Sequence, residues 1–309
     1  MTNPVKTDIA ASHRTRLGCS KIAQALGLSR WGTAYQLWEQ YTGKAPWPNI
    51  GHQLRVAIGE PMETVLKPHV EERIGRTLRR DRREYLHPTL PMVGHVDYRA
   101  SASPGESRPV VDMKTSLGWG AKNRFGGDGT DEVDDDVLLQ MQGYLMLTGA
   151  QTAYVAALVP GPDLKIYLIH ADLELHPLIE EGVEAFWWHV TTDTPPKLQT
   201  LDDVARRFAE SIAGQTVTAD DEVMHILAEL RDLNARRKAL DYERDMAELA
   251  LKTRMGEAEA LINLDGKPLC TWKNQSSTRI DTAALKAAGL YDTYTKTTNS
   301  RVFRLKGEK

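Results

Sequence analysis

Apolar residues recur along the N-terminal two thirds of the chain with two different periods, which predicts a mixture of helices and strands. Apolar residues spaced three and four apart share one face of a helix, whereas short runs rich in β-branched residues favour strands. This interpretation gives an α+β (α/β) protein. The expected helices span residues 20–27, 31–42, 53–74, 135–148 and 175–190, and the expected strands span residues 85–87, 92–101, 109–114, 152–158 and 165–170.

Residue types at the ends and on the faces of these helices add detail. Ser20 and Ser29 are expected to cap helices, because a serine oxygen accepts hydrogen bonds from first-turn N–H groups. Gly59 lies inside the helix expected at 53–74, where glycine costs about 1 kcal/mol relative to alanine, so it suggests that something approaches the helix closely there. Aromatic residues on helices are interpreted as packing residues rather than a base-stacking platform: Trp31, Tyr35, Trp38, Tyr41, Phe186, Trp187 and Trp188.

The remainder of the chain has a different character. A segment rich in Pro and Thr at 191–199 looks like the start of a linker, and it divides the chain into residues 1–200 and residues 201–309. Short and long helices are expected at 201–212 and 220–260, the second with heptad-like apolar spacing typical of a helical hairpin or coiled coil. A helix at 282–288 between strand-like segments at 268–273 and 301–305 completes this appendage.

Composition narrows the class of protein. A net charge of −3 over 309 residues excludes a global basic field but leaves room for a local basic groove. Two cysteines are too few for a disulfide framework or a thiolate metal site, and no segment is long and apolar enough to span a membrane, so we expect a cytoplasmic protein. The arginine-rich stretch 76–83, which includes Arg79 and Arg80, suits either a solvated strand edge or backbone phosphates.

The candidate chemistry lies on the strands. Asp112 and Lys114 are two positions apart on one expected strand and so share a face. Turn residues at 101–108 predict a hairpin, which would bring Asp97 of the preceding strand beside them. Carboxylate oxygens suit Mg²⁺ or Mn²⁺, and the lysine could orient a water; the alternative is a surface ion pair of little consequence. The Gly- and Asp-rich segment 116–136 is expected to form a mobile loop over this site.

Taken together, several short motifs occur in a fixed order. The motifs are Arg16-Leu-Gly followed by Ser20, Gly59-x-x-x-Glu63, Gly94-x-x-Asp97, Asp112-x-Lys114 and Gln140-x-Gln142-x-Tyr144. That succession resembles the YqaJ-like viral recombinase family, which comprises phage and prophage exonucleases similar to the lambda-type exonuclease within the PD-(D/E)xK nuclease superfamily. The resemblance covers residues 16–190 and implies a restriction-endonuclease-like core with a central mixed sheet flanked by helices.

The resemblance also implies roles for single residues. Asp97, Asp112 and the backbone oxygen of Met113 would be metal ligands, with Glu63 serving a second ion, so that two Mg²⁺ or Mn²⁺ are expected per site. Lys114 would position the water, and Gln140 would hydrogen-bond the water or the lysine. Binding of DNA and of its 5′-phosphate would involve Arg16, Ser20, Arg79, Arg80, Gln142 and Tyr144. Two departures are noted: Asp112 stands where the lambda-type enzyme has Glu, and Arg16 and Ser20 are more closely spaced.

The implied activity is a metal-dependent 5′→3′ exonuclease on linear double-stranded DNA. It would produce 3′ single strands for recombination by a single-strand annealing protein, and the enzyme would form a homo-oligomer, with a trimer as one form. Two other functions stay open at this point. One is an endonuclease of the same superfamily, and the other is a non-catalytic scaffold that binds DNA ends.

Overall fold

The computed structural model describes residues 13–49, 53–116, 118, 124–161, 163–298 and 300–306. The chain divides into two compact units, Met1–Phe208 and Ala209–Lys309. The structural boundary thus falls after Phe208, whereas the composition placed it after residue 200. The difference is helix α8 (Leu201–Arg207), which belongs with the first unit because buried Asp203 accepts a hydrogen bond from Thr33 at 2.8 Å.

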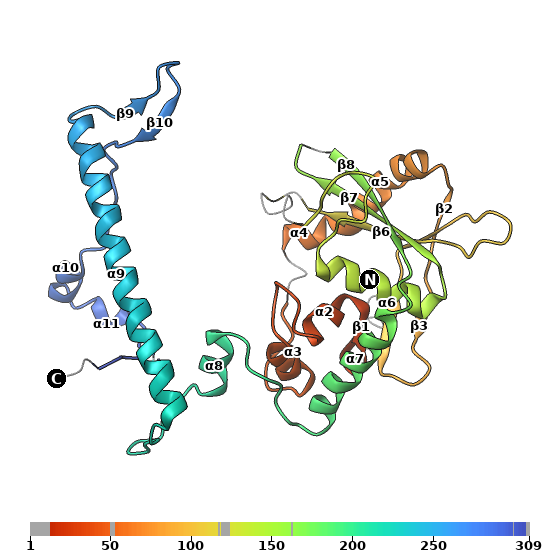
Figure 1. Cartoon of the computed structure of the whole chain (residues 1–309), viewed down its shortest axis with the longest axis horizontal. Coiled ribbons are helices and arrows are strands. Elements are labelled where there is room, and N and C mark those ends of the chain that lie inside the picture. The colour runs from red at the N-terminus through yellow and green to blue at the C-terminus, as the bar shows by residue number, and fades with distance from the viewer. Residues whose placement is uncertain are drawn as a thin grey trace. The chain divides into compact units, whose positions relative to one another are not determined.

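The first unit is built on a five-stranded mixed sheet, which together with its helices confirms the predicted α+β class (Figure 1). Its strand order is β2-β5-β6-β7-β8; β6 and β7 run parallel, and the other neighbours are antiparallel. The strands are β2 (Leu78–Arg80), β5 (Tyr98–Ala100), β6 (Val110–Thr115), β7 (Thr152–Val159) and β8 (Asp163–His170).

A second, three-stranded sheet with the order β1-β4-β3 lies in the same unit. It consists of β1 (Leu17–Gly18), β4 (Met92–His95) and β3 (Glu84–Leu86). The single strand expected at 92–101 was therefore wrong, because the chain leaves one sheet after His95 and joins the other at Tyr98. Asp97 lies in the connection between the two sheets. Because it is outside a strand, the direction of its side chain is not set by the alternation of strand residues.

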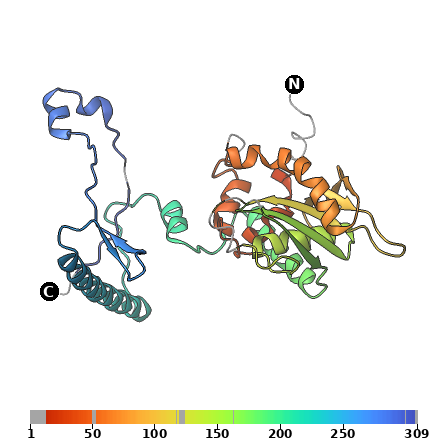
Figure 2. The same ribbon diagram turned by 90° about the horizontal axis from the view of Figure 1, so that it is seen from above.

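Helices cover both faces of the five-stranded sheet, as Figure 2 shows. On one face α5 (Gly59–Ile74) packs Leu66 and Val70 against Val111 and Met113 of β6. The other face carries Val110 of β6 and the larger core. The helices packed there are α2 (Ile22–Ala25), α3 (Ala34–Tyr41), α6 (Asp135–Thr148) and α7 (Leu175–Thr191).

The structure corrects several local expectations. Ser20 lies inside the 3₁₀ helix η1 (Cys19–Lys21) and caps no helix. The helix expected from residue 31 begins at Ala34 instead, because Thr33 and Gln36 form a capping box that fixes its start. Ser29 accepts a hydrogen bond from the Trp31 N–H outside any helix.

The long helix expected at 53–74 is divided into α4 (Leu54–Ala57) and α5. Gly59 is the first residue of α5, and no described atom comes within 4 Å of a Cβ built there. No described part of the chain therefore makes the close approach inferred from this glycine. On α7, Phe186 is buried, whereas Trp188 is more than half exposed and not packed against the sheet as expected.

The second unit consists of a long helix and small elements. Helix α9 (Asp221–Met255) is followed by a hairpin of β9 (Ala260–Ile262) and β10 (Pro268–Thr271), then by α10 (Thr282–Ala287) and α11 (Tyr291–Tyr294). Residues 300–306 form no strand, contrary to the prediction at 301–305. Among the helices of the described residues, none combines the length and apolar character that crossing a membrane requires.

Candidate active site

Strand register brings the two aspartates together. β5 and β6 are antiparallel, with Tyr98 opposite Val111, so the position before Tyr98 comes opposite Asp112. That position is Asp97, and its Oδ2 accepts a hydrogen bond from the Met113 N–H at 3.3 Å. The prediction that these two segments are antiparallel neighbours is confirmed, although Asp97 itself precedes β5.

Lys114 connects the aspartates to helix α6. Its Nζ lies 2.8 Å from Asp112 Oδ2 and donates to Gln140 Oε1 at 3.0 Å. Gln140 in turn donates from Nε2 to the Tyr144 hydroxyl at 2.9 Å, one helical turn further along. Asp112 and Lys114 therefore share one face of β6, as their spacing predicted, and that face is the one covered by α6.

The charged side chains Asp97, Asp112 and Lys114 are largely buried. Burial raises the pKa of Asp97 well above its usual range, and the neighbouring Asp112 and Glu63 raise it further. Burial by itself would lower the pKa of Lys114, but the charges of Asp112 and Asp97 outweigh it and the pKa is raised. Burial is also the main cause of the raised pKa of Tyr144. The lysine thus stays protonated, while the two aspartates repel each other.

Glu63 reaches the edge of this group from helix α5. Its side chain is largely buried, and its Oε2 lies 3.6 Å from a terminal nitrogen of Arg80 on β2. Its charge acts on Asp97, which places it among the predicted residues. Arg79, the neighbouring strand residue, is exposed. The structure therefore brings Glu63 close to Asp97, whereas Arg80, which contacts Glu63, is exposed like Arg79.

The oxygen donors fit a hard divalent cation that keeps part of its water. In the described part of the chain, no three His, Cys, Asp or Glu side chains lie close enough to hold a metal by themselves. Mg²⁺ commonly binds one or two carboxylates and takes its other ligands from water and phosphate. Asp97 and Asp112 meet that requirement. Met113 contacts Asp97 through its backbone N–H, so the role of its carbonyl oxygen as a metal ligand stays a prediction.

The expected phosphate residues lie along the parallel pair β1 and β4. Leu17 pairs with Met92 and Gly18 with Val93, so the chain after β1 runs beside the chain leading to Asp97. Arg16 precedes β1, and its carbonyl accepts a hydrogen bond from Tyr41 at 2.9 Å. Ser20 is exposed in η1. Arg16 and Ser20 thus lie just before and just after β1, and Ser20 caps no helix, contrary to expectation.

Gln142 is not at the site. It donates to the His170 carbonyl at 2.8 Å and accepts from the Asp172 N–H at 3.0 Å, so it connects α6 to the segment before α7. Residues two apart on a helix point in widely different directions, so Gln142 cannot face Lys114 together with Gln140. The DNA-binding role expected for Gln142 was therefore wrong. Tyr144 is buried, and its hydroxyl accepts the hydrogen bond from Gln140 that connects it to the site.

The described part of the segment 116–136 is firmly attached rather than a free loop. Arg124 forms an ion pair with Asp134 at 2.6 Å, and Phe125 forms a β-bridge with Val133. Residues 117 and 119–123 lie outside the described residues. Asp134 caps α6, as the acidic run suggested.

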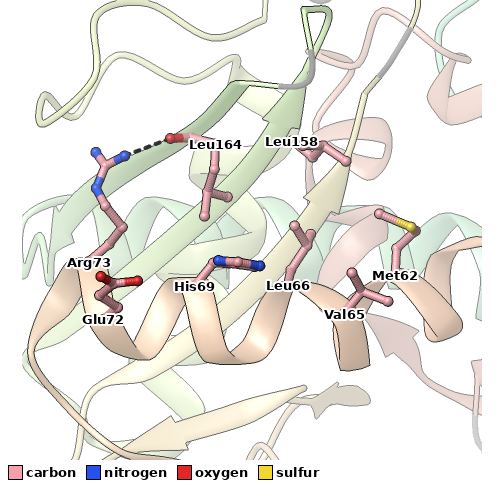
Figure 3. A pocket seen from close by; sticks show the side chains of 8 residues that line it. All are labelled: Met62, Val65, Leu66, His69, Glu72, Arg73, Leu158 and Leu164. Carbon is pink, nitrogen blue, oxygen red and sulfur yellow. Dashed lines mark hydrogen bonds between the residues drawn. The ribbon is translucent and has the colours of Figure 1, made fainter.

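A pocket of about 430 Å³ lies on the opposite face of the sheet, between α5 and strands β7 and β8 (Figure 3). Its walls are mainly apolar, with His69, Glu72 and Arg73 at one end. Arg73 donates to the Leu164 carbonyl at 3.0 Å. Because Asp112 and Lys114 face α6, this pocket is separate from the candidate site. Its lining residues are Met62, Val65, Leu66, His69, Glu72, Arg73, Leu158 and Leu164.

Sequence reasoning missed a cluster of Arg30, Trp31 and Arg124 near the start of α6. Trp31 was assigned to packing because it is spaced like a helical residue, yet it lies before α3 and is 65% exposed. The signal that could have found it is Thr33-x-x-Gln36, a capping-box pattern that puts the helix start after Trp31.

Comparison with known proteins gives relatives over most of the chain. The chain is 26% identical over 310 aligned residues to an uncharacterized protein, YqaJ, of Bacillus subtilis (strain 168), covering 95% of this chain and 92% of that protein. Among solved structures it is similar to an alkaline exonuclease from Laribacter hongkongensis, at 14% identity and a TM-score of 0.47, covering 64% of this chain and 96% of the other. It is also similar to a phage-related exonuclease from Haemophilus somnus 129PT, at 15% identity and a TM-score of 0.45. That similarity covers 57% of this chain and 94% of the other.

Residues 10–151 match the family model of the YqaJ-like viral recombinase domain. This range holds Asp97, Asp112, Lys114 and Gln140, which the fold brings together. The candidate site therefore lies within the part of the chain that is similar to the YqaJ-like viral recombinase domain.

Proposed function

We propose that the first unit is a metal-dependent DNA exonuclease of the PD-(D/E)xK type. It degrades linear double-stranded DNA from the 5′ end and leaves 3′ single strands for recombination. The observation that carries the proposal is the connected group at the ends of β5 and β6. Asp97 binds the Met113 N–H, Lys114 pairs with Asp112, and Gln140 accepts from Lys114.

The chain's own residues account for the steps that surround hydrolysis. Lys114, kept protonated by the aspartates, can hold and polarise a water beside the scissile phosphate. Gln140 fixes the direction of the lysine side chain, and Tyr144 fixes Gln140. Asp97 and Asp112, with Glu63 near them, would hold one or two Mg²⁺ or Mn²⁺ ions, which when bound would neutralise charge that develops on the phosphate.

A set of basic and hydroxyl groups supports binding of a strand end. Arg16 and Ser20 lie along the chain that runs beside β4 toward Asp97, where they could contact a 5′-phosphate. Arg79 and Arg80 lie on the edge strand β2 and could contact the backbone of the duplex. Contacts of this kind position DNA without reading its sequence, so we expect low sequence specificity.

The decisive experiment is digestion of linear duplex DNA in Mg²⁺, labelled at the end and supplied with and without a 5′-phosphate. The wild-type protein should shorten the phosphorylated strand from its 5′ end. Lys114→Ala should slow digestion by about 10²- to 10⁴-fold, the range for loss of a positioned acid–base group. Lys197→Ala is the matched control, since Lys197 is exposed and has no hydrogen bond or ion pair among the described residues.

Other outcomes would replace the proposal. Cleavage of a closed circular plasmid would indicate an endonuclease of the same superfamily. Tight binding of DNA ends without digestion in either Mg²⁺ or Mn²⁺ would indicate a scaffold. Digestion that survives Lys114→Ala would remove this cluster from the mechanism.

Assembly is a separate part of the proposal, and it follows from the family resemblance. We propose that the protein acts as a homo-oligomer together with a single-strand annealing protein. Apolar residues such as Val223, Ile226 and Leu233 are exposed on α9 and offer a surface for such contacts. Size-exclusion chromatography with light scattering tests the oligomer, and co-purification tests the partner.

A further inference from the structure

Trp31 is held at the surface although it is a large aromatic residue. It is 65% exposed, whereas Tyr35 and Trp38 in the helix that follows are 2% and 1% exposed. The Trp31 N–H donates to the Ser29 hydroxyl, which fixes the turn before α3. Trp31 therefore contributes little to the core, and its exposure calls for a different explanation.

Two guanidinium groups flank the indole ring. Arg30 Cζ lies 5.5 Å and Arg124 Cζ 5.6 Å from the centre of the Trp31 ring. Full stacking would bring carbon atoms to about 3.5–4.0 Å, so neither guanidinium covers the ring closely. The indole, which is 65% exposed, thus offers an apolar surface beside two cations, a combination that suits a planar base and its phosphates.

Both arginines are positioned by one carboxylate. Asp134 lies 3.7 Å from Arg30 and 2.6 Å from Arg124. Among the described residues, Arg124 donates hydrogen bonds only through Nε. A guanidinium carries five N–H donors, so its terminal nitrogens can contact phosphate oxygens without giving up Asp134.

This cluster lies close to the candidate active site. The charge of Arg124 acts on Lys114. The Arg30 N–H donates to Asp136 at 3.4 Å, and Asp136 precedes Gln140 by one turn of α6. At 1.5 Å per residue, the stretch of α6 from Asp134 to Gln140 measures about 9 Å, so the carboxylate that holds both arginines lies within two turns of the glutamine that contacts Lys114.

We propose that Trp31, with Arg30 and Arg124, binds an unpaired nucleobase and its adjacent phosphates near the phosphodiester held at Asp112 and Lys114. The inference rests on the proposed function, because it places the base relative to the site of hydrolysis. It assigns to this surface the single-stranded part of a DNA end. Stacking tolerates every base, so no sequence preference is expected.

Binding measured without hydrolysis tests this assignment separately from activity. The probe is a fluorescent duplex with a four-nucleotide single-stranded overhang, titrated with protein in EDTA and followed by anisotropy. Trp31→Ala should weaken binding by about 5- to 150-fold, the range for loss of one base stack, and Trp31→Phe should retain most of it. Trp188→Ala is the matched control, because Trp188 is also exposed but lies on α7.

A scan with abasic nucleotides distinguishes stacking from an indirect effect. One abasic position in the overhang should weaken binding of the wild type and cause no further loss with Trp31→Ala. The inference is wrong if the dissociation constant of Trp31→Ala is within twofold of that of Trp188→Ala. It is also wrong if the abasic position weakens binding equally in the wild type and in Trp31→Ala. Digestion of the same DNA in Mg²⁺ by the wild type tests the proposed function, so the two can fail independently.

Discussion

The close packing of helix α6 against the N-terminal segment gives a sharp prediction about stability. Gly143 lies inside α6, between Gln142 and Tyr144. A Cβ built on it would lie 2.5 Å from Ile22 Cδ1 and 3.1 Å from Cys19 Sγ. Ile22 and Cys19 are 0% and 2% exposed, so neither side chain can move into solvent. Gly143→Ala should therefore destabilise the first unit.

The magnitude follows from two opposing effects. Replacing glycine by alanine inside a helix favours folding by about 1 kcal/mol. Overpacking a filled core costs about 1–3 kcal/mol, and 2.5 Å to a buried methyl puts this site at the upper end. We expect a net loss of about 1–2 kcal/mol. For a unit of this size that corresponds to a decrease of roughly 2–8 °C in Tm.

Thermal and urea unfolding followed by circular dichroism measure the effect. Gly59→Ala is the matched control, because no described atom lies within 4 Å of a Cβ built at this position. The Tm of this variant should stay the same or rise slightly. The double variant Ile22→Val/Gly143→Ala removes the clashing Cδ1 atom. Ile22→Val alone should cost about 0.5–1.5 kcal/mol, and the double variant should lose less than the sum of the two.

A Gly143→Ala protein as stable as the wild type would refute this account of the helix contact. If the stability losses of the two single changes simply add in the double variant, Ile22 Cδ1 is not the atom that clashes with the new methyl group. The result also bears on the candidate site, because Gln140 and Tyr144 flank Gly143 on the same helix. A shift of α6 by a few tenths of an ångström would move the acceptor of Lys114 and lower digestion along with stability.

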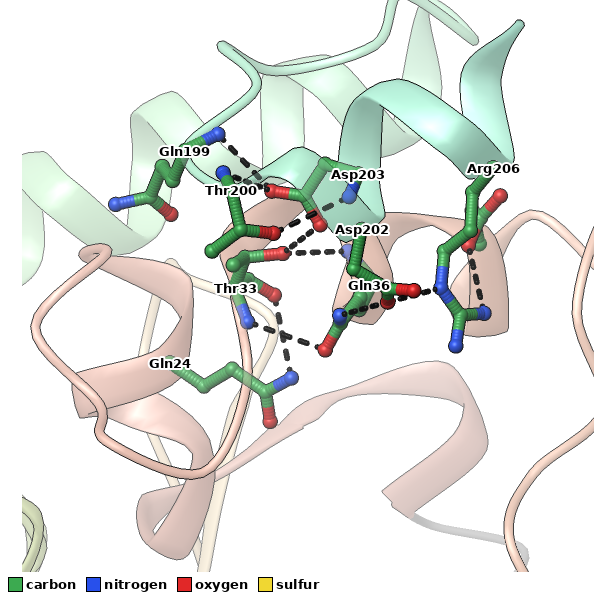
Figure 4. Close-up of polar contacts among 9 residues, drawn as sticks. Gln24, Thr33, Gln36, Gln199, Thr200, Asp202, Asp203 and Arg206 are labelled. Carbon is green, nitrogen blue, oxygen red and sulfur yellow. Dashed lines mark hydrogen bonds and ion pairs between the residues drawn. The ribbon is translucent and has the colours of Figure 1, made fainter. Parts of the chain in front are cut away.

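Three further predictions concern single polar groups. Asp203 accepts hydrogen bonds from Thr33 and two backbone N–H groups while fully buried (Figure 4), so Asp203→Ala should cost about 2–4 kcal/mol in urea unfolding; no loss would mean that α8 is not attached through this residue. Because the pKa of Asp97 is raised to about 8, the folded state holds a proton that the unfolded state releases near pH 4. Metal-free stability should thus fall as pH rises from about 4 to 8, and Asp97→Asn should flatten this decline in pH-dependent Tm measurements. Tyr144→Phe removes the acceptor of the buried Gln140 amide and should lower digestion about fivefold, the value of one neutral hydrogen bond, together with a lower Tm; an unchanged rate would show that Gln140 needs no support.

Local patterns in the sequence determined the elements whose residues interact mainly with their neighbours along the chain. The helix predicted at 135–148 matches α6, because Asp134 caps its start and Gly149 ends it in the left-handed conformation. Lys114 and Asp112 share a face because strand periodicity requires it, whatever the rest of the fold.

Tertiary structure decided what depends on segments far apart in the sequence. Asp97 meets Asp112 because the chain changes sheets after His95 and then pairs in register with β6, and no local pattern encodes that change. Gln142 was expected at the site on the strength of its motif, but its partners are residues 170 and 172, which only the packed fold brings near. The sequence thus determined which side chains could carry the chemistry, and long-range pairing determined which of them meet, because a contact between distant segments depends on register and packing that no short stretch contains.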